Sequence, residues 1–165
     1  MPYLLSFYSY CKRAELSWRN KLLKDDIDGY AGNINPTEAW EILKADSKSI
    51  LLDVRTLAEW TFVGVTDLSS LKKDAVKIEW KTFPNMEINP FFIDEVINAC
   101  PEKSVPILSL CRSGQRSIDA SRVLTEHGFQ KCYNVLEGFE GDTNTNSQRI
   151  SKEGWKHRNL PWKQN

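Results

Sequence analysis

The stretch CRSGQRS, from Cys111 to Ser117, combines residue types that can perform nucleophilic chemistry. It follows the short apolar run VPILSL and precedes IDASRVLTEHG, a segment with a helical pattern. The loop therefore lies where a strand gives way to a helix, and Cys111 is its first residue. Because ligands of open α/β sheets bind at the carboxyl ends of the strands, we expect a binding site here.

Three features of this loop favour a negatively charged sulfur or a bound anion. The N–H groups and the dipole of the following helix supply partial positive charge. Gly114 permits tight backbone curvature, while Arg112 and Arg116 add full positive charges. Such surroundings favour a thiolate over a thiol. We therefore predict that Cys111 is an activated nucleophile, and not a cysteine that only fills space at a strand end.

Strands and helices alternate along most of the chain. Apolar runs typical of strands cover residues 49–54, 75–80, 105–110 and 131–138. Helical patterns cover residues 35–46, 56–62, 88–101 and 115–128. The first of these begins with a capping asparagine followed by proline, a typical helix start. This alternation predicts an α/β fold with a mainly parallel central sheet flanked by helices.

Length and charge argue against several classes of protein. The chain has 165 residues with 22 basic and 22 acidic side chains, which gives no electrostatic reason to expect nucleic acid or a membrane as a partner. No stretch approaches the roughly 20 apolar residues of a membrane span. The first residues lack the basic segment and cleavage site of a secretory signal. We expect a cytoplasmic protein with free thiols.

The other cysteines and the histidines do not indicate a metal site. No pair among the four cysteines has the C-x-x-C spacing of a zinc ribbon or thioredoxin motif. We interpret Cys100 and Cys132 as structural, whereas Cys11 is uninformative. His127 and His157 are not expected to be catalytic bases.

The chain resembles a single-domain rhodanese, which is a sulfurtransferase. The resemblance rests on LLDVRTLAEWTFVGV, CRSGQRS and YNVLEGFEGD, which occur in the order and spacing of the family. These stretches are similar to its D-x-R-x-x-x-E-[YW] segment, its C-x-x-G-x-R active loop and its terminal G-[FW]-x-G motif. The G-H-I-x-G-A segment usual in the family appears here as GVTDLS, so the shape of the pocket wall stays open.

The resemblance implies sulfur transfer through a persulfide on Cys111. The sulfur would come from a small donor such as thiosulfate and pass to a thiophilic acceptor, either a small thiol or a protein. No metal or organic cofactor is implied. The implied substrate-binding residues are those of the loop: Arg112, Ser113, Gly114, Gln115, Arg116 and Ser117.

Asp53, Arg55 and Glu59 are the implied supporting residues. Glu59 matches the acid that pairs with the loop arginine, here Arg116, while the other two end the neighbouring strand. A salt bridge or a helix cap without a role at the site is an equal alternative for all three. Trp80 is either a pocket residue or plain core.

The resemblance also suggests how the chain divides. We expect a pre-domain segment over residues 1–29, a rhodanese-like domain over 30–142, and a polar loop with a tail over 143–165. The tail carries Trp155, Leu160 and Trp162. Because so much exposed apolar surface would be unusual, we predict that the tail packs on the domain.

Other functions stay open at this level. A phosphatase of the same fold has a longer loop than the four residues that separate Cys111 from Arg116, so the spacing favours sulfur. A rhodanese-like binding module usually lacks the cysteine. A redox-sensing role needs a second cysteine within ~7 Å between Cα atoms. The physiological donor, the acceptor and the oligomeric state are not predicted.

Overall fold

A parallel five-stranded sheet forms the centre of the computed structural model, which describes residues 29–164. The strand order is β1-β8-β7-β2-β4, and all neighbouring pairs are parallel. The strands span Gly32–Ile34 (β1), Ile50–Asp53 (β2), Val76–Lys77 (β4), Pro106–Leu110 (β7) and Lys131–Val135 (β8). The predicted α/β class is confirmed. The segment expected over residues 1–29 lies outside the described residues, apart from Gly29.

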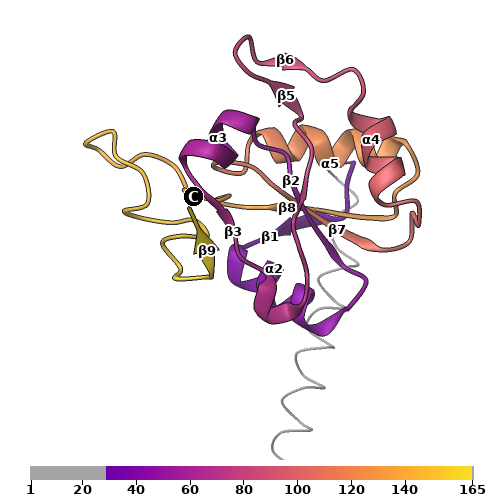
Figure 1. Cartoon of the computed structure of the whole chain (residues 1–165), viewed down its shortest axis with the longest axis horizontal. Helices are drawn as coiled ribbons and strands as arrows, with labels where there is room; N and C mark the ends of the chain where they lie inside the picture. Colours follow the sequence, from indigo (N-terminus) through magenta and orange to yellow (C-terminus); the bar gives the residue numbers. More distant parts are fainter. Residues whose placement is uncertain (1–28, 165) are drawn as a thin grey trace, which may run out of the picture.

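Helices cover both faces of the sheet (Figure 1). They span Pro36–Ala45 (α2), Leu57–Phe62 (α3), Phe92–Ala99 (α4) and Arg116–Glu126 (α5), with a 3-10 turn at Ser69–Leu71 (η1). All four predicted helices are confirmed, within a few residues at each end. In residues 29–164, no helix has both the length and the apolar character that crossing a membrane requires.

Local signals explain where α2 begins. Asn35 caps the helix by accepting a hydrogen bond from the Glu38 N–H at 3.0 Å, and its own N–H donates to Glu38 Oε2 at 2.8 Å. This reciprocal pair satisfies two N–H groups that a helix start otherwise leaves unpaired. Ala39 and Leu43 then lie buried against the sheet.

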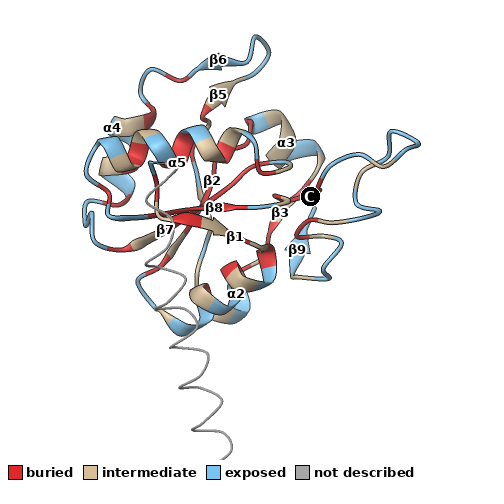
Figure 2. Cartoon of the chain, turned by 180° about the vertical axis from the view of Figure 1, so that it is seen from behind, coloured by how far each residue is buried: buried red, intermediate tan, exposed pale blue. Residues whose placement is uncertain are grey.

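Alternating residues of the strands build a separate core on each face of the sheet. On β7, Ile107 belongs to the cluster beneath α4 and α5, and Leu108 belongs to the cluster beneath α2. This period of two is that of a strand buried on both sides. Figure 2 shows the buried residues concentrated along the strands and on the inner faces of the helices.

Short strands were the part of the fold that the sequence did not predict. The expected strand at 75–80 pairs with β2 as β4 over only two residues. Two small antiparallel pairs were not expected: Lys81–Thr82 (β5) with Glu87–Ile88 (β6), and Val65–Thr66 (β3) with Trp162–Lys163 (β9). Two-residue strands have no periodicity to recognise, and β9 pairs with a segment far away in the sequence.

Candidate active site

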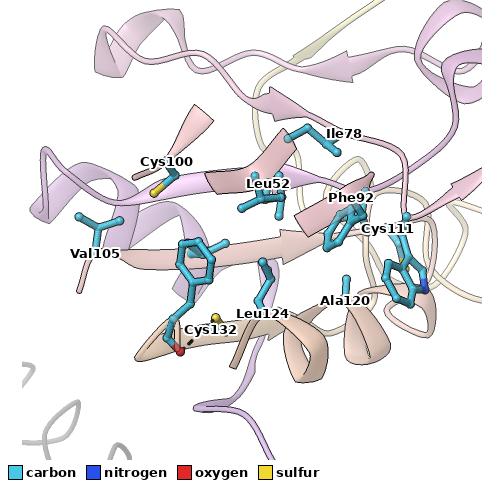
Figure 3. Packing of buried hydrophobic residues seen from close by; sticks show 14 residues of the cluster. Leu52, Ile78, Phe92, Cys100, Val105, Cys111, Ala120, Leu124 and Cys132 are labelled. Carbon is cyan, nitrogen blue, oxygen red and sulfur yellow. Dashed lines mark hydrogen bonds between the residues drawn. The ribbon is translucent and has the colours of Figure 1, made fainter. Parts of the chain in front are cut away.

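Cys111 is the first residue after β7, and its side chain is only 1% exposed. Its sulfur accepts a hydrogen bond from the Gly114 N–H at 3.2 Å, and the Ser117 hydroxyl lies 3.2 Å from the same sulfur. Gly114 belongs to the turn before α5, and Ser117 lies in the first turn of that helix. Figure 3 shows Cys111 at one end of the apolar cluster, with Val105 and Cys100 at the other. The sulfur thus has the Gly114 N–H and the Ser117 hydroxyl on one side and apolar side chains on the other.

The loop residues alternate between the interior and the solvent. Cys111, Gly114 and Ser117 are buried, Ser113 and Arg116 are partly buried, and Arg112 and Gln115 are exposed. Of the predicted loop residues, Gly114 and Ser117 are within hydrogen-bond distance of the Cys111 sulfur. Arg112 and Gln115 form the solvent-exposed outer rim of the loop.

The stretch after β8 fixes the backbone of the loop. The Phe139 N–H donates to the Cys111 carbonyl at 2.8 Å, and the Glu140 N–H donates to the Arg112 carbonyl at 2.9 Å. Gly138 has a φ of +59°, and a Cβ atom there would lie 2.4 Å from the Cys111 carbonyl oxygen. Gly114 has a φ of +88°, which also favours glycine. Glycine at 138 is thus required for close contact between the two segments.

Arg116 and Glu59 form a two-pronged ion pair beside the loop. Arg116 Nη1 donates to Glu59 Oε2 at 2.8 Å, and Nη2 donates to Oε1 at 2.7 Å. Glu59 also accepts from the Thr56 N–H at 3.0 Å, which caps α3. Burial opposes ionisation of Glu59, but the hydrogen bonds from Arg116 and Thr56 prevail and lower its pKa to about 2. The two alternatives for Glu59, loop pairing and helix capping, therefore coexist.

Asp53 and Arg55 form a fully buried ion pair at the end of β2. The Asp53 carboxylate accepts from Arg55 Nε at 2.9 Å and from Nη2 at 2.7 Å, and both side chains are 0% exposed. Arg55 also donates to the Gly64 carbonyl and stacks over the Phe139 ring at 4.1 Å. Since Phe139 holds the Cys111 carbonyl, this pair supports the loop without touching the sulfur.

Trp80 lies in the core. It is 5% exposed, packs edge-on against Phe92 at 5.0 Å, and belongs to the same apolar cluster as Cys111. Among residues 29–164, its indole N–H has no hydrogen-bond partner.

A series of hydrogen-bonded polar side chains that was not predicted from the sequence lies next to Cys111. The Ser117 hydroxyl lies 2.6 Å from Asn134 Oδ1, and Asn134 Nδ2 donates to Asn33 Oδ1 at 2.9 Å. Asn33 and Asn134 are direct partners on β1 and β8. An asparagine inside the apolar run of β8 was the available signal, since a buried amide requires partners.

The other described cysteines lie far from Cys111. Cys132 pairs in register with Ile107 on β7, four residues before Cys111, which corresponds to roughly 13 Å along a strand. Figure 3 shows Cys100 and Cys132 toward the opposite end of the cluster. Neither can form a disulfide with Cys111 without large backbone movement, and Cys11 lies outside the described residues. Within residues 29–164, no cluster of three or more His, Cys, Asp or Glu could hold a metal ion.

The chain is similar to several known proteins. The protein-family model described as "STR4 middle domain" matches residues 31–165 of this chain. An uncharacterized protein of Rickettsia conorii is 35% identical over 131 residues, which is 79% of this chain and 95% of that protein. The crystal structure of Rv0390 from M. tuberculosis is 45% identical, covers 82% of this chain and 99% of its own, and has a TM-score of 0.76.

Two further relatives have descriptive names. Rhodanese-like domain-containing protein 17 of Arabidopsis thaliana is 31% identical over 108 residues, covering 58% of this chain and 69% of its own length. Thiosulfate sulfurtransferase GlpE of Actinobacillus pleuropneumoniae is 26% identical over 108 residues, covering 66% of this chain and 82% of its own length.

Proposed function

The chain belongs to the rhodanese-like family, and from this membership we propose that it is a sulfurtransferase that carries sulfur as a persulfide on Cys111. One observation carries the proposal. The Cys111 sulfur lies at the carboxyl end of β7 with the Gly114 N–H directed at it from 3.2 Å, inside a turn that opens a helix. Such a turn stabilises negative charge on the first sulfur, or on a second one bonded to it.

The first half-reaction forms the persulfide. The Cys111 thiolate attacks the outer sulfur of a donor such as thiosulfate, and a new S–S bond forms. The bond between the two thiosulfate sulfurs breaks, and sulfite leaves with the electron pair. The negative charge stays on the terminal sulfur, where the loop donors and Arg116 stabilise it.

The second half-reaction returns the thiolate. A nucleophilic acceptor, either cyanide in an assay or a small thiol or protein thiolate, attacks the terminal sulfur and takes it. The S–S bond breaks, and its electron pair returns to Cys111. Exposed Arg112, on the outer rim of the loop, attracts anionic donors. Two separate half-reactions predict ping-pong kinetics.

The geometry favours sulfur over phosphate. Four residues separate Cys111 from Arg116, and Arg116 is engaged by Glu59 through both terminal nitrogens. A phosphatase arginine must instead hold the phosphate oxygens. The loop is thus small, and its second arginine is already paired.

Two assays run in parallel test the function. We expect thiosulfate:cyanide transfer by the wild-type protein, loss of this activity in Cys111→Ser, and near-normal activity in the control Cys132→Ser, whose cysteine is also buried but lies far from the loop. Hydrolysis of an aryl phosphate should be absent. Phosphatase activity that requires Cys111, without sulfur transfer, would overturn the proposal.

A further inference from the structure

The Ser117 hydroxyl lies between two groups that compete for its proton. The Cys111 sulfur is 3.2 Å away, and Asn134 Oδ1 is 2.6 Å away. A hydroxyl has one proton to donate, so it serves only one acceptor at a time. The 2.6 Å contact is at the short end of the range for O–H···O hydrogen bonds, which indicates that the hydroxyl donates to Asn134 Oδ1. The Ser117 oxygen then faces the sulfur as an acceptor.

The orientation of the Asn134 amide is fixed from its far side. Asn134 Nδ2 donates to Asn33 Oδ1 at 2.9 Å, and the Tyr30 hydroxyl donates to the same oxygen at 3.0 Å. If the Asn134 amide turned over, its oxygen would face the Asn33 oxygen. Two facing acceptors repel one another, so Asn134 presents its oxygen to Ser117 as long as Asn33 is in place.

The Ser117–Asn134 contact, unlike the Gly114 N–H, suits a thiol better than a thiolate. A thiol can donate its S–H to the Ser117 oxygen, whereas a thiolate needs donors only. When Cys111 ionises, Ser117 must turn its proton toward the sulfur, and the buried Asn134 oxygen loses its partner. Leaving a buried acceptor unpaired is costly, so Asn134 opposes formation of the thiolate.

We propose that Asn134 is a positioning residue that withholds the Ser117 proton from Cys111 and so raises the pH at which the thiolate forms. The proposal rests on the proposed function for the use made of that thiolate.

Charged groups around the sulfur act in parallel with this chain. Arg116 interacts electrostatically with Cys111, and also with Glu59 of α3 and Asp53 at the end of β2. Arg55 pairs with Asp53, and Arg112 lies on the outer rim of the loop. The variants proposed below leave all of these charges in place, so that a change in ionisation reports on the hydrogen-bond chain.

The test is the pH dependence of Cys111 alkylation by iodoacetamide, followed on the Cys111 peptide by mass spectrometry. Asn134→Leu keeps the approximate size of the side chain and removes its acceptor, so the midpoint of the profile should fall by about half to one pH unit. Ser117→Ala removes the donor to the thiolate and should raise the midpoint by about one unit. The double variant should behave like Ser117→Ala, because Asn134 acts only through Ser117.

Two further variants serve as a control and as an independent test. Ser121→Ala is the matched control, since Ser121 lies one turn further along α5, is 0% exposed, and has a hydroxyl without a hydrogen-bond partner among the described residues. It should leave the midpoint unchanged. Asn33 is only partly buried, and Asn33→Ala removes the acceptor that fixes the Asn134 amide. This variant should also lower the midpoint, and it provides the test if Asn134→Leu does not fold.

The outcomes separate this proposal from the proposed function. If Asn134→Leu and Asn33→Ala leave the midpoint unchanged or raise it, or if the effect of Asn134→Leu persists without Ser117, the proposal is wrong. Alkylation requires no sulfur donor, so this result stands whether or not the wild-type protein takes up sulfur. Absence of sulfur uptake would instead count against the proposed function alone.

Discussion

At the scale of single residues, the site relies on side chains that each serve two segments. Glu59 caps α3 through Thr56 and binds Arg116 of the loop. Asp53 and Arg55 join the end of β2 to Phe139, which in turn holds the Cys111 carbonyl. Loss of one such residue therefore disturbs two contacts, and the disturbance reaches Cys111 through the backbone.

The low pKa of Glu59 predicts a specific dependence of stability on pH. A folded-state pKa of about 2, against an ordinary value of 4.5, means that Glu59 stabilises the fold fully above pH 4.5 and loses this contribution as the pH falls toward 2. Glu59→Gln should therefore be less stable than the wild-type protein at neutral pH. The difference in their free energies of unfolding should shrink between pH 4.5 and 2, as measured by urea unfolding.

Glu102→Gln is the control for this measurement. Glu102 pairs with Lys48, but both side chains are more than half exposed, at 53% and 66%. Exposed pairs contribute little to stability. A difference of the same size and pH dependence for Glu102→Gln would show that the Glu59 effect is not specific to the ion pair beside the loop.

At the scale of elements, the sequence predicted those whose signals are local. Asn35 and Pro36 marked the start of α2, and the apolar runs marked β2, β7 and β8. The sequence also placed Cys111 at a strand end before a helix. By contrast, the Ser117–Asn134 contact and the β3–β9 pair join segments far apart in the chain, and no local pattern encodes which distant residues meet.

The tail offers a prediction at this scale, because its two tryptophans differ in burial. Trp155 is 0% exposed, packs edge-on against Trp40 at 6.0 Å, and donates from its indole to the Pro161 carbonyl at 2.8 Å. Trp162 in β9 is 41% exposed. Trp155→Ala should cost about 3–5 kcal/mol of unfolding free energy. Trp162→Ala should cost about 1 kcal/mol, mainly from its contacts with Phe139 and Lys156.

Chemical unfolding of both variants provides the measurement. Equal losses of stability would contradict the burial pattern and would mean that the tail is held chiefly through β9. We further expect the folded fraction of Trp162→Ala to retain sulfur transfer, because within residues 29–164 the ring contacts of Trp162 are with Phe139 and Lys156 and not with the loop.

At the scale of the whole molecule, segments distant in sequence converge on one sulfur. The end of β2, the loop before α5, the stretch after β8 and the tail lie in successive contact. The tail contacts the stretch after β8 through two backbone hydrogen bonds. The Trp155 N–H donates to the Gly138 carbonyl at 2.9 Å, and the Lys156 N–H donates to the Phe139 carbonyl at 3.1 Å. We therefore propose that the tail, although it follows the domain predicted over 30–142, forms part of the same cooperative unit.

The central claim is that Cys111 accepts sulfur, and the intact mass of the protein tests it most directly. After incubation with thiosulfate and removal of excess donor, the wild-type protein and Cys132→Ser should each gain the mass of one sulfur atom, and cyanide should remove it. Cys111→Ser should gain nothing. An unchanged wild-type mass, or an added sulfur that persists in Cys111→Ser, would contradict the account.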